Sequence, residues 1–96
     1  MAGRIARLTP GFRRALHALG IVPGSTRRLA LASTIASLSD ADVLPSPADF
    51  LTDFRPGRAY VRRIAGQNLW ILYRFDNDHV DVLAIRDTPP VPLDDE

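Results

Sequence analysis

Apolar and polar residues alternate over residues 58–75, RAYVRRIAGQNLWILYRF, and this alternation constrains the fold more than any other feature of the chain. A period of two places successive side chains on opposite faces of a strand. Gly66-Gln67-Asn68 interrupts the alternation as a hairpin turn does, and Asp76-Asn77-Asp78 follows as a second turn. The pattern predicts a three-stranded antiparallel meander with strands over 59–65, 69–75 and 79–86.

The first part of the chain has a helical period instead. Thr9-Pro10 provides an N-cap and a proline for the first turn, and Gly20 suits the residue after a helix end. Ser25 can cap a second helix. Residues 9–38 therefore predict an α-hairpin, and the alternation over residues 4–8 predicts a short strand before it.

Prolines punctuate residues 39–57 and recur in residues 88–96. Ser46-Pro47 resembles a cap followed by a first helical residue, so we expect a short helical turn over residues 50–54. The end of the chain, TPPVPLDDE, predicts an extended or disordered proline-rich acidic tail. One domain is expected over residues 1–87.

Together these elements predict an α+β fold in which an N-terminal α-hairpin packs on a small, mainly antiparallel sheet. The chain has no cysteine, and its two histidines lie in different elements, so we expect no metal site and no cofactor. No apolar run approaches the roughly 18 residues of a membrane span, and a cytoplasmic protein is expected.

The net charge of +1 hides an asymmetry. Residues 1–63 hold ten arginines and four acids, whereas residues 64–96 hold two arginines and seven acids. All twelve cations are arginine. The cause is either codon usage or the ability of arginine to form bidentate hydrogen bonds with phosphate and carboxylate groups.

Arginines on the predicted sheet are the candidates for chemistry. Arg62 and Arg63 are adjacent, so they point to opposite faces and at most one shares a face with Arg74. If one of them converges with Arg74 and Arg86, they form a phosphate trap that binds RNA or stabilises a phosphate being cleaved. The alternative is a soluble outer face whose arginines pair with acids across strands.

Other side chains allow two interpretations each. His79 follows the acidic turn and is either a general acid–base group or a solvent-exposed hairpin residue. Trp70 and Tyr73 either stack on nucleic-acid bases or belong to the core.

The element order and the stretch GRAYVRRIAGQNLWILYRFDNDHVDVLAIR resemble the RelE/ParE family of bacterial toxins. The corresponding parts are a basic strand, VRRIAG, an apolar strand ending in Tyr-Arg, LWILYRF, an acidic turn, DNDH, and a valine-rich strand, VDVLAIR. The resemblance covers residues 4–87.

This resemblance implies a growth-inhibiting toxin of a type II toxin–antitoxin pair, held inactive by a cognate antitoxin. RelE-like members cut mRNA in the ribosome with basic sheet residues, whereas ParE-like members poison DNA gyrase. Carried over to this chain, the resemblance implies a catalytic set of Arg62, Arg63, Arg74 and Arg86. The implied nucleic-acid-binding set is Arg58, Arg62, Arg74 and Arg86.

The chain departs from the RelE-like pattern, because it has no lysine and no tyrosine or histidine after His79. A ribonuclease would then lack an obvious proton carrier, since arginine is a poor general base. Whether the chain is an enzyme stays open, with a slight preference for a toxin that only binds its target. The third hypothesis is a non-toxic protein- or nucleic-acid-binding module that shares the fold.

Overall fold

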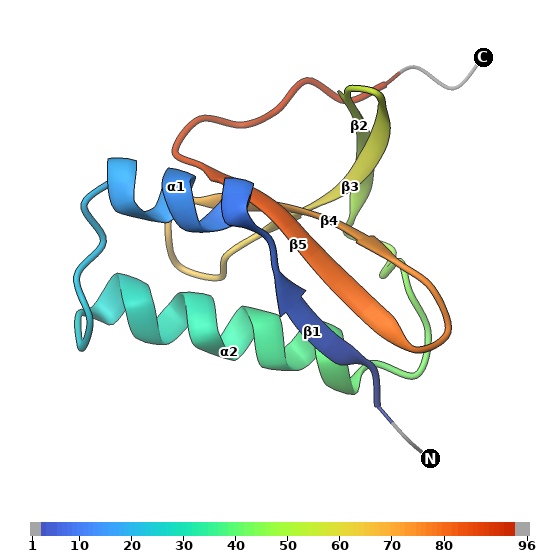
Figure 1. Ribbon diagram of the computed structural model, residues 1–96, viewed down its shortest axis with the longest axis horizontal. Helices are drawn as coiled ribbons and strands as arrows, with labels where there is room; N and C mark the ends of the chain where they lie inside the picture. The colour runs from blue at the N-terminus through green and yellow to red at the C-terminus, as the bar shows by residue number, and fades with distance from the viewer. Residues whose placement is uncertain (1–2, 94–96) are drawn as a thin grey trace.

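Five strands form one sheet, and two helices cover one of its faces (Figure 1). The computed structural model describes residues 3–93. The elements are β1 Ile5–Leu8, α1 Pro10–Ala18, α2 Thr26–Asp40, β2 Phe50–Phe54, β3 Gly57–Arg63, β4 Trp70–Phe75 and β5 His79–Arg86. Strands follow the order β1-β5-β4-β3-β2, and only β1 with β5 is a parallel pair. The predicted α+β class, with two N-terminal helices on a mainly antiparallel sheet, is confirmed.

Both helices begin at the cap residues that the sequence predicted. The Thr9 hydroxyl accepts a hydrogen bond from the Phe12 amide, and the Ser25 hydroxyl accepts one from the Arg28 amide. Each bond satisfies an amide that has no partner inside its helix. Gly20 follows α1 with φ +66°, a left-handed conformation that favours glycine.

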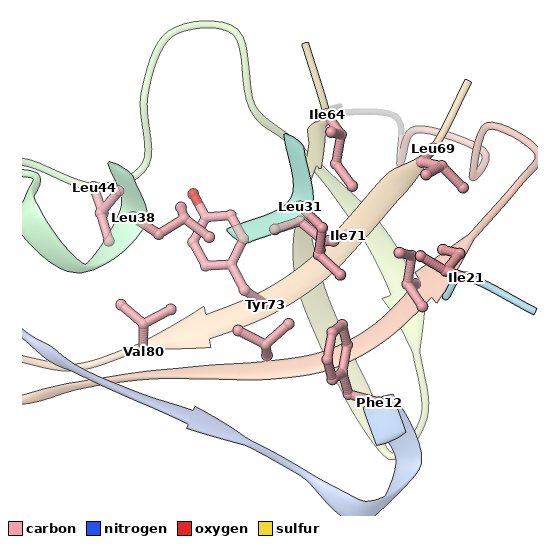
Figure 2. Packing of buried hydrophobic residues seen from close by; sticks show 12 residues of the cluster. Phe12, Ile21, Leu31, Leu38, Leu44, Ile64, Leu69, Ile71, Tyr73 and Val80 are labelled. Atoms are coloured by element: carbon pink, nitrogen blue, oxygen red, sulfur yellow. The ribbon is translucent and has the colours of Figure 1, made fainter. Parts of the chain in front are cut away.

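The main core lies between the helices and the sheet. Leu31 and Leu38 of α2 lie beside Ile71 and Tyr73 of β4, and Phe12 of α1 belongs to the same cluster (Figure 2). All five side chains are at most 2% exposed. Complete burial of a large apolar side chain contributes about 1.5–3 kcal/mol, so this layer holds the helices to the sheet.

The opposite face of the sheet, which we call the helix-free face, carries a smaller apolar cluster. Ala59, Val61, Leu72 and Ala84 are buried there, and Phe50, Phe54, Trp70 and Leu83 pack around them. The register of β4 with β5 shifts between Leu72 and Tyr73. Leu83 is the extra residue at this bulge.

The expected helical turn over residues 50–54 is wrong, because these residues form the edge strand β2. Phe50 and Phe54 are four residues apart, a spacing that fits a helix and a strand equally well over so short a segment. Pairing with β3 in the register Thr52↔Ala59 satisfies the backbone and sends both phenylalanines to the helix-free face. The same pairing makes β3 start at Gly57, two residues earlier than predicted.

The tail returns from β5 to the far edge of the sheet (Figure 1). Pro92 forms an isolated antiparallel bridge with Thr52, and the Leu93 amide donates to the Leu51 carbonyl at 2.9 Å. The predicted tail includes residues 94–96, which lie outside the described residues. No helix within residues 3–93 is long and apolar enough to cross a membrane.

Candidate functional site

Arg62 and Arg63 lie side by side in β3 and enter two different environments. Arg62 pairs in register with Ile71, on the face that the helices cover, whereas Arg63 pairs with Trp70 on the helix-free face. The prediction that pleating separates these two arginines is confirmed. A site shared by both of them is therefore excluded by the sheet itself.

Arg62 belongs to a buried polar network. Its Nε and Nη2 atoms donate to the two carboxylate oxygens of Asp49, each at 2.9 Å. The Tyr73 hydroxyl donates to the same carboxylate. The side chain of Asp49 is fully buried, and that of Arg62 is 16% exposed. A bidentate guanidinium with this partner is occupied and is not directed at a ligand.

The network raises the pKa values of Arg62 and Tyr73. The hydrogen bond to Asp49 raises the pKa of the Arg62 guanidinium further above its ordinary value. Burial is the main cause that raises the pKa of the Tyr73 phenol, and the hydrogen bond to Asp49 raises it further. The Arg62 guanidinium and the Tyr73 phenol thus stay protonated at neutral pH. The network connects the segment before β2 to the centre of the sheet.

Sequence reasoning did not identify Asp49 as the partner of Arg62. The signal that was available is the spacing of Ser46 and Asp49, whose carboxylate does accept a hydrogen bond from the Ser46 amide at 3.1 Å. In a sequence, a serine with an acid three positions later also fits the start of a helix, which agrees with the helical turn expected after Ser46-Pro47. The pairing with Arg62 depends on how the loop crosses the sheet, which no local pattern encodes.

On the helix-free face, Arg63, Trp70 and Arg86 form one cross-strand row. Trp70 lies opposite both arginines in register, Arg63 in β3 and Arg86 in β5. The Arg63 guanidinium lies 5.8 Å from the centre of the Trp70 ring and donates to the Gln67 carbonyl and to Asn68 Oδ1. This row brings two arginines beside one aromatic ring on the helix-free face.

Arg74 shares the face of this row but not its position. It lies four residues along β4 from Trp70, about 13 Å at the rise of a strand. Its guanidinium lies over the Phe54 ring and donates to the carbonyls of Arg58 and Phe54 at 2.8 and 3.0 Å. Arg74 therefore closes the turn between β2 and β3.

The predicted arginine sets are thus divided among separate locations. Arg58 lies opposite Asp53 near the outer edge of the sheet, away from the row of Arg63 and Arg86. Only Arg63 and Arg86, from the predicted catalytic set, lie beside a common neighbour, Trp70.

The remaining candidates also separate. His79 Nδ1 lies 3.6 Å from Asp76 Oδ1, at the opposite end of β5 from Arg86, about 23 Å away. Amides of Asp78 and His79 donate to the Asp76 carboxylate and lower its pKa. Tyr73 is a core residue, and Trp70 is half-buried. No group of three potential metal ligands occurs within the described part of the chain.

A groove lies between the two helices, which do not pack closely against each other. Its volume is about 420 Å³. The lining is mostly apolar and consists of Ala6, Leu8, Phe12, Leu16, Leu31, Ala32, Ile35, Ala36 and Ser39, with Arg13 and Arg28. Residues 3–39, which contain both helices up to their last turn, include no acidic residue. The groove is therefore apolar, and the charged residues that line it, Arg13 and Arg28, are both positive.

Comparison with known proteins gives a structural relationship. No protein-family model and no curated protein matches the sequence. A chain of the toxin–antitoxin complex RelBE2 from Mycobacterium tuberculosis is similar in structure, with a TM-score of 0.54 and 22% identity. The alignment covers 90% of this chain and 92% of that chain. This chain has a RelE-like fold. The fold expected from the resemblance of residues 4–87 is thereby confirmed.

Proposed function

We propose that this chain is the toxin of a bacterial type II toxin–antitoxin system and acts in the cytoplasm. The RelE-like fold supports this proposal, since the similar solved structure is a toxin–antitoxin complex. The observation that carries it is the apolar groove between α1 and α2. The core does not need an open apolar groove for its packing, whereas an inhibitor that binds the chain needs an exposed apolar surface.

The groove fits an amphipathic helix of an acidic antitoxin. Leu16 and Ile35 supply apolar contacts from the two helices, and Ala32 and Ala36 keep the groove open. Arg13 and Arg28 lie along it, so carboxylates that flank the apolar stripe of an inserted helix would be paired. Charge complementarity selects an acidic partner over a neutral or basic one.

Neutralisation by this partner can be tested by charge reversal. We expect Arg13→Glu with Arg28→Glu to abolish rescue of growth by the protein encoded in the adjacent reading frame, while toxicity is kept. Arg14→Glu with Arg27→Glu is the matched control, because these neighbours do not line the groove. Equal rescue of both double variants would contradict docking in the groove.

We further propose that the toxin acts by binding its target, as ParE-like members do, without cutting RNA. Arg62, Arg63 and Arg74 all donate hydrogen bonds to groups of the protein itself, and of the predicted catalytic set only Arg63 and Arg86 share a neighbour. A cleaving site also needs a proton carrier. Within residues 3–93, the histidines lie on α1 and at the far end of β5, and neither belongs to the row around Trp70.

The experiment for the mechanism compares the wild-type chain with an Arg63→Ala, Arg86→Ala variant after induction. We expect growth arrest by the wild-type chain with unchanged mRNA 5′ ends and impaired DNA replication. The double variant should lose arrest if the row contacts the target. New mRNA ends that disappear in the double variant would establish a RelE-like ribonuclease instead. Absence of arrest in the wild-type chain would favour a non-toxic binding module with this fold.

A further inference from the structure

The outer edge of β2 is covered by the tail of the same chain. The Leu93 amide donates to the Leu51 carbonyl, and the Thr52 hydroxyl donates to the Val91 carbonyl at 2.8 Å. Thr52 is only 5% exposed, and this bond satisfies its hydroxyl. An edge strand exposes unpaired backbone groups that invite another strand, and the tail occupies part of that edge.

The tail is held only weakly on the edge of β2, so it can dissociate from that edge. Prolines at positions 89, 90 and 92 have no amide to donate, so a continuous ladder with β2 cannot form. Val91 is 78% exposed and Leu93 is 38% exposed, so little apolar surface holds the segment in place. A strand without prolines would make more hydrogen bonds with the same edge.

The other edge of the sheet is closed in a different way. The Arg4 amide donates to the Ser39 carbonyl at 2.8 Å, and the Ser39 hydroxyl donates back to the Arg4 carbonyl. Arg4 Nη1 also reaches the Ala41 carbonyl at 2.9 Å. The end of α2 thus blocks the approach to the start of β1, whereas β2 is covered only by the tail.

We propose that residues 88–93 cover the edge of β2 and prevent it from pairing with a second copy of this chain. When these residues are released, two copies pair through their β2 strands. Antiparallel pairing centred on Thr52 makes a self-complementary edge. It places Phe54 opposite Phe50 of the second copy, on the helix-free face. It also places Leu51 opposite Asp53 of the second copy, on the other face.

The first test releases the tail within the full chain. Leu93→Pro removes the amide that bonds Leu51, and Thr52→Val removes the hydroxyl that bonds Val91 while keeping a β-branched side chain. Sedimentation should show self-association of the double variant tightened by about tenfold or more over wild type. Leu93→Ala, which keeps the amide, is the control and should behave as wild type. A double variant that is folded and no more associated than wild type would overturn the proposal.

The second test addresses the register of pairing. In the released chain, Leu51→Asp puts like charges opposite each other twice, because Asp53 of each copy faces position 51 of the other. Leu51→Lys puts opposite charges there. We expect the aspartate to abolish pairing and the lysine to preserve it. Equal association of the two variants would rule out pairing through β2.

Amide exchange in the unmodified chain keeps the proposal testable if the released variant does not fold. The Leu93 amide should exchange more slowly than that of Val91, because only the former is hydrogen-bonded to β2. Equal rates would show that the tail does not guard the edge. All these measurements use purified protein without target or antitoxin, so their outcome is independent of the toxin proposal.

Discussion

The two faces of the sheet use the same residue type for different purposes. On the helix-covered face, Arg62 is held by a buried carboxylate and is largely withdrawn from water. On the helix-free face, Arg63 and Arg86 flank Trp70, and Arg86 stays exposed. The difference shows that an arginine beside an aromatic residue in the sequence is informative only once its face and its partners are known. The same substitution of an arginine on each face should therefore change the stability of the chain by different amounts.

The largest contrast is expected between Arg62→Ala and Arg63→Ala. The first leaves the Asp49 carboxylate buried without its cation, which costs about 3–5 kcal/mol. The second removes an exposed arginine and should cost less than about 1 kcal/mol. Denaturant unfolding of both variants measures the difference. Equal losses would mean that the two arginines have equivalent environments, contrary to the structure.

A double variant refines this comparison. Replacing Asp49 and Arg62 together by Leu and Met removes both charges and should recover part of the stability lost by Arg62→Ala alone. No recovery would show that the hydrogen bonds of Asp49 with Tyr73 and Ser46, and not the unpaired charge, dominate its contribution.

A smaller effect is expected from Tyr73→Phe, which deletes the hydroxyl that donates to Asp49. The cost at neutral pH should be about 1–3 kcal/mol, since a buried acceptor loses one partner. Because the folded chain raises the pKa of Tyr73, its contribution is complete below about pH 10 and is lost as the pH rises further.

The measurement for Tyr73 is stability against pH between neutral and alkaline conditions. Tyr73→Phe should reduce the alkaline loss of stability that the wild-type chain shows. Tyr60→Phe is the control, because Tyr60 stacks on Tyr73 at a ring distance of 5.8 Å but lies outside the network. An identical alkaline slope in wild type and Tyr73→Phe would contradict the buried position of this phenol.

The smallest effect concerns Asp76, in the exposed turn before β5. Backbone amides lower its pKa in the folded chain, so its contribution to stability is present above about pH 4 and is lost as the pH falls through the lowered value. Asp76→Asn should flatten the acid side of the stability curve slightly. A marked loss of stability at neutral pH would instead reveal a structural role for this carboxylate.

The sequence predicted much of the fold because the relevant signals are local. The caps at Thr9 and Ser25 and the alternation over residues 58–75 depend on neighbours a few positions away. The strand at residues 50–54 was mistaken for a helical turn because its two phenylalanines satisfy both periods. Its pairing with β3 decided between them.

The sequence by itself determined that Arg62 and Arg63 face opposite ways, since this follows from the geometry of any strand. It also determined that residues 3–39 carry arginines and no acidic residue. Only the tertiary structure decided which of the two arginines is buried, because Asp49 reaches Arg62 from a loop thirteen positions earlier. The groove between α1 and α2 and the cover on β2 likewise arise from elements distant in sequence, whose approach no local pattern specifies.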